Sequence, residues 1–387
     1  MITDSNGRDE RTRATVALAR SDTYERGDVA RAVAEVLGHL GGIETFVRPG
    51  QRVLLKPNLL SAKSPDRAIT THPIVLEALI EAVRGAGGEP LIGDSPGGAV
   101  RGVERVWENT GMRDLAERTG VALVSFEAAG SEEVRGELRS YRIARPVLEA
   151  DVVINVPKMK THILTTYTGC IKNMFGAVPG FAKGRLHSIV PRPEPFSRHI
   201  VDIYGLVRPV LNVMDAVVAM EGDGPSGGRP RQVGAIIAGA DGVAVDAVAS
   251  GMVGCDEGAV HAVRIAGERG LGVARREHIE IKGADPASFD LEGFELPKTR
   301  IFDLMPTFLV RALRPWIWLY PEMSKEWGCR GRACGLCVAS CPVGAIAMTD
   351  SGPVVDRRAC VECLCCHEVC PEQAVNIRLS WLAKRFA

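Results

Sequence analysis

Nine of the eleven cysteines in this chain of 387 residues fall between Cys329 and Cys370. Eight of these nine form two sets, and each set ends in a Cys-Pro pair. The second set consists of Cys360, Cys363, Cys366 and Cys370. Its spacing is that of a loop that gives three thiolates to one iron–sulfur cluster and a fourth thiolate to a neighbouring cluster. The spacing therefore predicts iron–sulfur ligation and redox chemistry.

The first set resembles the second except at its start, where four residues rather than two separate Cys329 from Cys334. Crossed ligation predicts two [4Fe–4S] clusters. The first would be held by Cys329, Cys334, Cys337 and Cys370, and the second by Cys341, Cys360, Cys363 and Cys366. The longer spacing leaves open whether Cys329 is a ligand and whether the first cluster keeps its fourth iron.

A similar run of small and apolar residues follows each Cys-Pro pair, at 343–347 and 372–376, which indicates an internal duplication. Structural zinc and disulfide bonds remain alternatives, because tetrahedral sulfur sites also suit zinc. Cys365 falls outside the spacing and is expected to be a spare thiol. Cys170 and Cys255 stand alone, and we expect them to be small buried hydrophobic residues.

Polar residues that could bind or transfer protons follow several apolar runs in the first part of the chain. If 158–162 is extended, its basic residues share one face, since side chains alternate along a strand. A glycine-rich stretch at 180–187 is expected to be a flexible loop that closes over substrate. The polar residues are Lys56, Asn58, Asp94, Lys158, Lys160, His162, Lys172, Asn173, Lys183, Arg185 and His187.

So many cations in a chain without net charge predict a pocket for a small anionic ligand. We expect Lys56, Asn58, Lys158, Lys160, Lys172 and Asn173 to bind it. His162, His187 and Asp94 are the candidate proton donors, because histidine exchanges protons near neutral pH. The alternative is that the lysines only solvate strand ends. Asp246 lies in an apolar run, and either a salt bridge to lysine or a catalytic role would explain it.

The elements that must position these residues are predicted from hydrophobic periodicity. Helices are expected at 29–40, at 243–253 and from Pro73 to about Gly85, where proline suits the first turn. Alternation of strands and helices predicts an α/β fold with a mainly parallel sheet and flanking helices. Strands are expected at 15–18, 52–55, 90–92, 121–124, 151–156, 212–218 and 233–237.

The domain organisation follows from these patterns. Residues 1–300 are expected to form the α/β domain, and 327–387 a small α+β module of ferredoxin type. Between them, 301–326 is apolar but contains charged residues and prolines, so it is not a clean membrane span. We interpret it as a docking linker. Peripheral contact of its aromatic residues with a membrane remains an alternative.

The 47 basic and 47 acidic residues balance, which argues against a nucleic-acid partner. The polar N-terminus and the many thiols favour the cytoplasm. Neither a dinucleotide-binding nor a P-loop fingerprint is present. A flavin or an additional metal remains open as a further cofactor.

Several short motifs resemble the family called domain of unknown function 362. They are Lys56-Pro-Asn58, Gly93-Asp-Ser95, Pro157-Lys-Met-Lys-Thr-His162, Ile171-Lys-Asn173 and Glu221-Gly-Asp-Gly-Pro225. The resemblance covers about 50–255, and it implies an iron–sulfur protein of redox function, since family members commonly carry a two-cluster ferredoxin module.

Two hypotheses of function follow. The first is a reductase in which electrons from an external protein partner pass through both clusters to an anionic substrate in the Lys/His pocket. The second is an electron relay or maturation partner that performs no chemistry of its own. A sensor or structural role for the clusters would leave the basic residues unexplained.

Overall fold

The computed structural model describes residues 13–97, 103–180, 182–190, 192–297, 316, 319–324 and 328–381, without the side chains of 185, 187 and 188. Most of the expected docking linker therefore lies outside the described residues. Within it, Trp316 is exposed, whereas 319–323 form a strand. The candidate proton donor His187 lies on a described helix, but its side chain is outside the described part.

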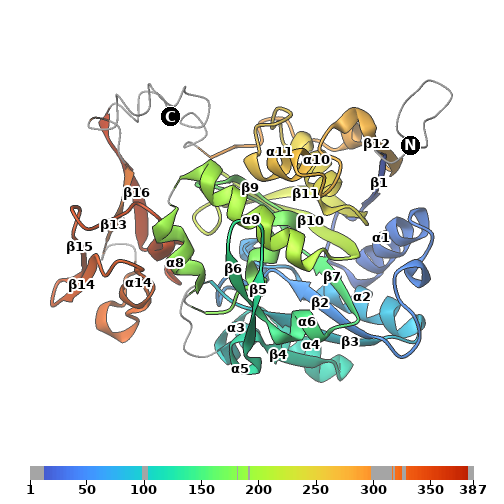
Figure 1. Cartoon of the computed structure of the whole chain (residues 1–387), viewed down its shortest axis with the longest axis horizontal. Helices are drawn as coiled ribbons and strands as arrows, with labels where there is room; N and C mark the ends of the chain where they lie inside the picture. The colour runs from blue at the N-terminus through green and yellow to red at the C-terminus, as the bar shows by residue number, and fades with distance from the viewer. Residues whose placement is uncertain are drawn as a thin grey trace.

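A ten-stranded sheet forms the centre of the first domain (Figure 1). Most neighbouring strands are parallel, and β11 is antiparallel to both of its neighbours. The strand order is β12 (Ile279–Gly283), β1 (Ala14–Arg20), β11 (Arg229–Gly239), β10 (Leu211–Glu221), β7 (Val152–Val156), β2 (Arg52–Pro57), β3 (Glu89–Asp94) and β4 (Ala122–Ser125). β8 (Lys158–His162) pairs with β10 and with β9 (Thr166–Thr168). The predicted mainly parallel α/β sheet is confirmed.

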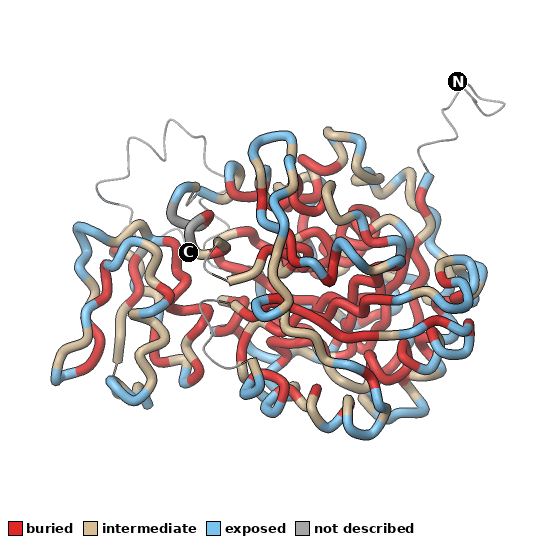
Figure 2. Tube along the Cα trace, turned by 60° about the horizontal axis from the view of Figure 1, so that its bottom comes forward, coloured by how far each residue is buried: buried red, intermediate tan, exposed pale blue. Residues whose placement is uncertain are grey.

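Helices cover both faces of this sheet, and a hydrophobic core lies between the sheet and the helices on each face. The middle of the domain is buried, and exposed residues lie at its outside (Figure 2). Alternation along β2 divides its side chains, so that Leu54 joins one core while Val53 and Leu55 join the other. One core contains α1 (Arg26–His39), α2 (Pro73–Gly85) and α4 (Met112–Thr119). The other contains α7 (Cys170–Asn173), α9 (Pro193–Val207), α10 (Gly242–Met252) and α11 (His261–Glu268).

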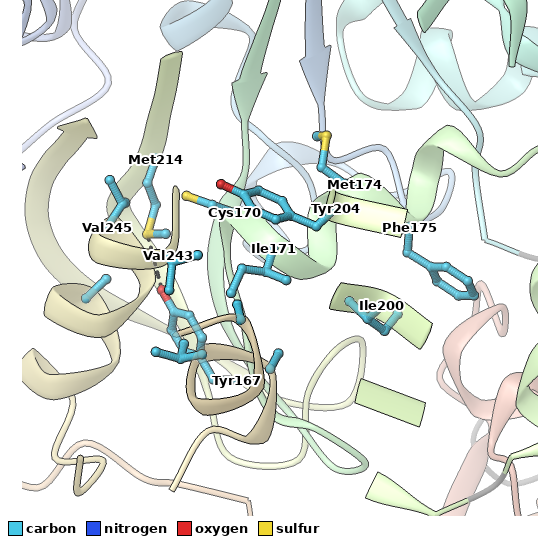
Figure 3. Close-up of a cluster of buried hydrophobic side chains, with 14 of the residues drawn as sticks. Tyr167, Cys170, Ile171, Met174, Phe175, Ile200, Tyr204, Met214, Val243 and Val245 are labelled. Carbon is cyan, nitrogen blue, oxygen red and sulfur yellow. Dashed lines mark hydrogen bonds between the residues drawn. The ribbon is translucent and has the colours of Figure 1, made fainter. Parts of the chain in front are cut away.

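The second core fixes the short helix α7. Figure 3 shows Tyr167, Ile171 and Met214 packed among side chains of α9 and α10. The Tyr167 hydroxyl donates to the Met214 sulfur at 3.3 Å. Cys170 and Cys255 are buried in this core, as the sequence predicted for lone cysteines. The polar residues of α7 are therefore carried by a helix that is anchored on its apolar side.

The cysteine-rich segment forms a small α+β unit beside the first domain (Figure 1). Its strands pair as β13 (Leu319–Met323) with β16 (Val375–Leu379), and β14 (Ile346–Thr349) with β15 (Gly352–Val355). Two four-residue helices, α14 (Leu336–Ala339) and α15 (Cys365–Glu368), pack against each other. Each helix begins two residues after a cysteine of the predicted ligand sets.

The backbone of this unit repeats itself at matching positions. Residues just before α14 and α15, Gly335 and Leu364, both have left-handed φ angles, of 64° and 59°. In each half the cysteine of the Cys-Pro pair accepts a backbone N–H from the residue four positions on, Ala345 to Cys341 Sγ at 3.1 Å and Ala374 to Cys370 Sγ at 3.2 Å. A positive φ angle is unfavourable for a residue with a side chain, such as Leu364. The packing of the repeat must therefore impose this backbone conformation.

One expected element is wrong. The glycine-rich stretch at 180–187 was predicted to be a flexible loop, but Ala182–Ile189 forms helix α8. Its Lys183 is buried and donates to backbone and side-chain oxygens of the loop after β3.

No helix among the described residues is long and apolar enough to cross a membrane.

Candidate functional site between the sheet and the cysteine-rich unit

The ends of β2 and β3 are joined by a buried ion pair. Lys56 Nζ lies 2.7 Å from Asp94 Oδ1, and the other carboxylate oxygen of Asp94 accepts the N–H of Leu59 at 2.8 Å. Burial lowers the pKa of Lys56, and the charge of Asp94 opposes this shift. Gly176 packs on the pair, since a Cβ there would overlap Asp94 Oδ1 and lie 2.6 Å from Lys56 Nζ. The two residues therefore neutralise each other.

A second buried ion pair fixes the start of β8. Lys158 Nζ lies 2.9 Å from Asp215 Oδ2 of β10 and donates to the Tyr24 hydroxyl at 2.6 Å. The Tyr24 hydroxyl donates to the second Asp215 oxygen at 2.8 Å, and its ring stacks on His72. Asp215 also accepts the backbone N–H of His72 at 2.9 Å. The charge of Lys158 is therefore met within the first domain.

Within the described part of the chain, the hydrogen-bond partners of Lys160 are neutral. Its Nζ donates to Asn58 Oδ1 at 3.1 Å and to the carbonyl oxygen of Ile69 at 2.8 Å. Burial, with the nearby cation of Lys172 as a further cause, lowers the pKa of Lys160 to about 7. This lysine can therefore exchange a proton near neutral pH.

His162 ends β8 and points toward the cysteine-rich unit. Its Nδ1 accepts the backbone N–H of Leu164 at 3.0 Å, so the neutral ring carries its proton on Nε2. Nε2 lies 3.3 Å from Glu368 Oε1 on α15. The predicted extended strand is confirmed, but its three basic side chains contact different partners. His162 connects the two units of the chain.

A pocket with a volume of about 80 Å³ lies where the sheet meets the cysteine-rich unit. From the first domain it is lined by the ends of β2, β3 and β8, by α7 and by α8. From the other unit it is lined by Ser340, which directly follows α14, by residues of α15 and by the residue after α15. The lining polar residues are Asn58, Asp94, Ser95, Lys160, Thr168, Lys172, Asn173, Lys183, Ser340, Cys365 and Glu368.

The lining carries an excess of positive charge. Its ammonium groups belong to Lys160, Lys172 and Lys183, and its carboxylates to Asp94 and Glu368. Asp94 is already matched by Lys56. Burial lowers the pKa of Lys183 to about 8 and also lowers the pKa of Lys172. The pocket is therefore suited to an anion, and its charge depends on pH near neutrality.

Asn173 and Asp246 position the elements of the site. Asn173 Nδ2 donates to Asn155 Oδ1 at 2.8 Å and approaches the carbonyl oxygens at the end of β2. Asp246 accepts the N–H groups of Cys170 and Ile171, at 2.6 and 2.9 Å, at the start of α7. Burial raises the pKa of Asp246 to about 7, although these two N–H groups favour its charged form. The observed contacts of Asp246 are these backbone N–H groups and not the salt bridge to lysine that the sequence offered as one alternative.

The predicted ligands of the first cluster line one small cavity. Cys329, Cys334, Cys337 and Cys370 all contribute to it. Of the second predicted set, Cys363 and Cys366 are buried, and Cys341 and Cys360 are half-buried. Among the described residues, no three or more His, Cys, Asp or Glu side chains converge tightly enough for a single metal ion.

Comparison with known proteins identifies the family of the first domain. The family model described as Domain of unknown function (DUF362) matches residues 53–251. The chain belongs to the DUF362 family. Its relatives include the thylakoid-associated protein sll1697 of Synechocystis, 34% identical over 294 residues, which are 76% of this chain and 89% of that protein.

Two further similarities are more limited. A stretch of 53 residues is 38% identical to one subunit of the ion-translocating oxidoreductase complex of Methanosarcina acetivorans, covering 14% of this chain and 19% of that protein. Among solved structures, the lactate racemase apoprotein of Thermoanaerobacterium thermosaccharolyticum is similar with a TM-score of 0.39 and 15% identity, over 60% of this chain and 56% of that one.

The DUF362 region supplies only one side of the pocket. It contains the lysines of the site, whereas Ser340, Cys365 and Glu368 come from beyond it. Among the residues predicted from the sequence, Asn58, Asp94, Lys160, Lys172, Asn173 and Lys183 line the pocket. Lys56 and Lys158 are held in buried ion pairs, and His162 lies against Glu368, which lines the pocket. Thr168, Ser340 and Glu368 were missed, since nothing in a lone hydroxyl or carboxylate marks it as part of a site.

Proposed function

We propose that this DUF362 protein is an iron–sulfur reductase, which passes electrons from an external donor through two [4Fe–4S] clusters to a small anion in the Lys-lined pocket. The observation that carries the proposal is a shared pocket. Lys160 and Lys172 of the first domain line the same cavity as Cys365, which is the direct neighbour of the predicted ligand Cys366.

The residues fit the clusters in several respects. Four predicted ligands line one cavity, and the two Cys-Pro cysteines accept matching backbone N–H groups. Hydrogen bonds to sulfur are among the features by which proteins tune such clusters. The partial similarity to a component of an ion-translocating oxidoreductase complex also supports a redox role.

When bound, the clusters would supply one-electron transfer. Residues of this chain would bind the anion and provide protons. Lys172 offers positive charge, and His162 holds a proton on Nε2 beside Glu368. Lys160, with a pKa of about 7, is a second proton source at neutral pH.

Iron and sulfide analysis with EPR spectroscopy of anaerobically purified protein tests the clusters. We expect about eight irons per chain and interacting reduced spectra. Cys366→Ser is expected to lose roughly half of the iron, because it removes a predicted ligand. The matched variant Cys365→Ser should keep all of it. An iron content near zero, or equal losses in both variants, would contradict the proposal.

Reoxidation of the dithionite-reduced protein separates the two functions that the sequence left open. A reductase is expected to be reoxidised by a small carboxylate or another anion that fits the pocket, with product formed. Electron exchange with a protein partner, without product from any anion, would favour the relay or maturation partner instead.

A further inference from the structure

Two hydroxyl groups in the pocket are buried and have no hydrogen-bond partner in the part of the chain that the structure describes. Thr168 is 2% exposed and Ser340 is 7% exposed, and both line the pocket. Among the described residues, neither Thr168 Oγ1 nor Ser340 Oγ has a hydrogen-bond partner. Buried hydroxyls are normally hydrogen-bonded, so each such group calls for an explanation. These two come from different units, Thr168 from the end of β9 and Ser340 from the residue after α14.

A third polar group in the same cavity is available for a ligand. The ammonium groups of Lys160 and Lys183 already donate to protein oxygens, two for Lys160 and three for Lys183. Among the described residues, no hydrogen bond or ion pair holds the ammonium of Lys172, which also lines the pocket. One cation and two hydroxyl donors therefore border the same small space.

We propose that Thr168, Lys172 and Ser340 together bind the carboxylate group of a small substrate, which spans the two units of the chain. A carboxylate offers about four lone-pair sites on two oxygens, which suits three donors. The surplus of positive charge in the pocket is small, because Glu368 also lines it and burial lowers the pKa of Lys160 to about 7 and of Lys183 to about 8, so a singly charged carboxylate matches it better than a doubly charged phosphate. The cavity of about 80 Å³ is roughly half the size of one that accepts benzene, at about 150 Å³, so the substrate has few heavy atoms.

The carboxylate site extends the proposed function. The role of the bound carboxylate as electron acceptor rests on that proposal. Ser340 directly precedes Cys341, and Cys365 directly precedes Cys366. Cys341 and Cys366 are predicted ligands of the second cluster. A carboxylate held by Ser340 would therefore bind beside the redox group that serves it.

Isothermal titration calorimetry of the full chain, purified anaerobically and with its iron measured, tests the site with acetate. We expect saturable binding of one acetate, weaker binding of inorganic phosphate and none of acetamide, the neutral analogue. Lys172→Met is expected to reduce the acetate affinity at least about ten-fold, and Thr168→Val and Ser340→Ala roughly three- to ten-fold each.

Two further variants control for charge and for folding. Lys282→Met removes an exposed cation remote from the pocket and should leave the acetate affinity unchanged. Thr168→Ser keeps the hydroxyl and should retain the affinity that Thr168→Val loses. Iron-replete protein without saturable acetate binding would overturn this inference and leave the redox proposal standing. Acetate binding to protein without iron would support the site and overturn the redox proposal. Tighter binding of phosphate than of acetate would overturn the proposal that the ligand is a carboxylate.

Discussion

The ammonium group of Lys160 is buried, and among the described residues it donates to two neutral acceptors. Lys172 and Lys158 act on it as like charges, and Glu368 and Asp94 as opposite charges. The neighbouring pairs Lys56–Asp94 and Lys158–Asp215 are self-contained. Titration of the site near neutral pH is therefore expected to come from Lys160, with a pKa of about 7, and Lys183, with a pKa of about 8.

Acetate affinity is expected to fall as the pH rises through about 7 and about 8, because Lys160 and Lys183 lose their positive charges there. We expect a roughly ten-fold decrease between about pH 6 and 9. Calorimetric titrations at constant ionic strength measure it. Lys160→Met should reduce the change in acetate affinity near pH 7. An acetate affinity that stays constant with pH in the wild type would contradict the assignment of this titration to Lys160 and Lys183.

Lys160 should also make stability depend on pH. Its folded pKa of about 7 lies below the ordinary lysine value of 10.5, so between these values the unfolded chain binds more protons. The free energy of unfolding must then rise with pH across this window. Lys160→Met is expected to lower that slope by up to about 1.4 kcal/mol per pH unit in urea titrations. The exposed control Lys282→Met should keep the wild-type slope.

At the scale of elements, the turn from β9 into α7 depends on close packing. A Cβ on Gly169 would overlap Asp246 Oδ1 and lie 2.7 Å from Tyr167 Cε1. Asp246 accepts the first two N–H groups of α7, and the helix carries Lys172 and Asn173. The position of these site residues therefore depends on a glycine that touches no ligand.

Gly169→Ala is expected to destabilise the protein by about 2–4 kcal/mol, because the new methyl group must displace the Asp246 carboxylate from buried N–H groups. Chemical unfolding monitored by circular dichroism measures the change. Gly38→Ala is the matched control, since nothing lies within 4 Å of a Cβ there. It should be neutral or slightly stabilising, because alanine favours a helix interior. Similar losses in both variants would exclude the packing argument.

Elements were predicted well where hydrophobic periodicity is strong. The strand at 52–55 and the helix beginning at Pro73 are observed with nearly the expected bounds. The stretch at 180–187 was misread, because its glycines suggested a loop, whereas Lys183 and Leu186 are buried and hold it in place as a helix. Tertiary contacts also decide the ion pairs. No local pattern indicates that Lys56 meets Asp94, or that Ser340 reaches a pocket lined by lysines more than 150 positions away.

At the scale of the whole molecule, a few polar contacts join the two units. The Ser226 hydroxyl donates to the carbonyl oxygen of Glu368 at 3.0 Å, and Gln373 Nε2 donates to the carbonyl oxygen of Ser226. Arg67 donates to the Gln373 side chain at 2.5 Å. The Glu221–Pro225 motif leads directly into this junction, and Pro225 itself lines the pocket. The motif therefore belongs to the contact between units as well as to the site.

Gly227→Leu is expected to loosen this junction, because a Cβ at residue 227 would lie 2.7 Å from His367 Cε1. The acetate affinity should fall about as far as in Ser340→Ala, roughly three- to ten-fold, while iron content is retained. Limited proteolysis should become faster between the units. Gly27→Leu, on the exposed start of α1 where a Cβ meets nothing, is the control. Unchanged affinity and unchanged proteolysis in Gly227→Leu would contradict a site shared by the two units.

The two repeats of the cysteine-rich unit have different surroundings. Cys365 and Glu368 of the second repeat face the pocket, and their counterparts in the first repeat are Leu336 and Ala339, which do not line it. Cys363 and Cys366 are buried, whereas Cys334 and Cys337 of the first repeat are half-buried, and Val343 is 40% exposed. In the proposed redox function, one repeat therefore serves as the entrance for electrons from outside and the other as the exit toward the substrate, which gives the chain a direction.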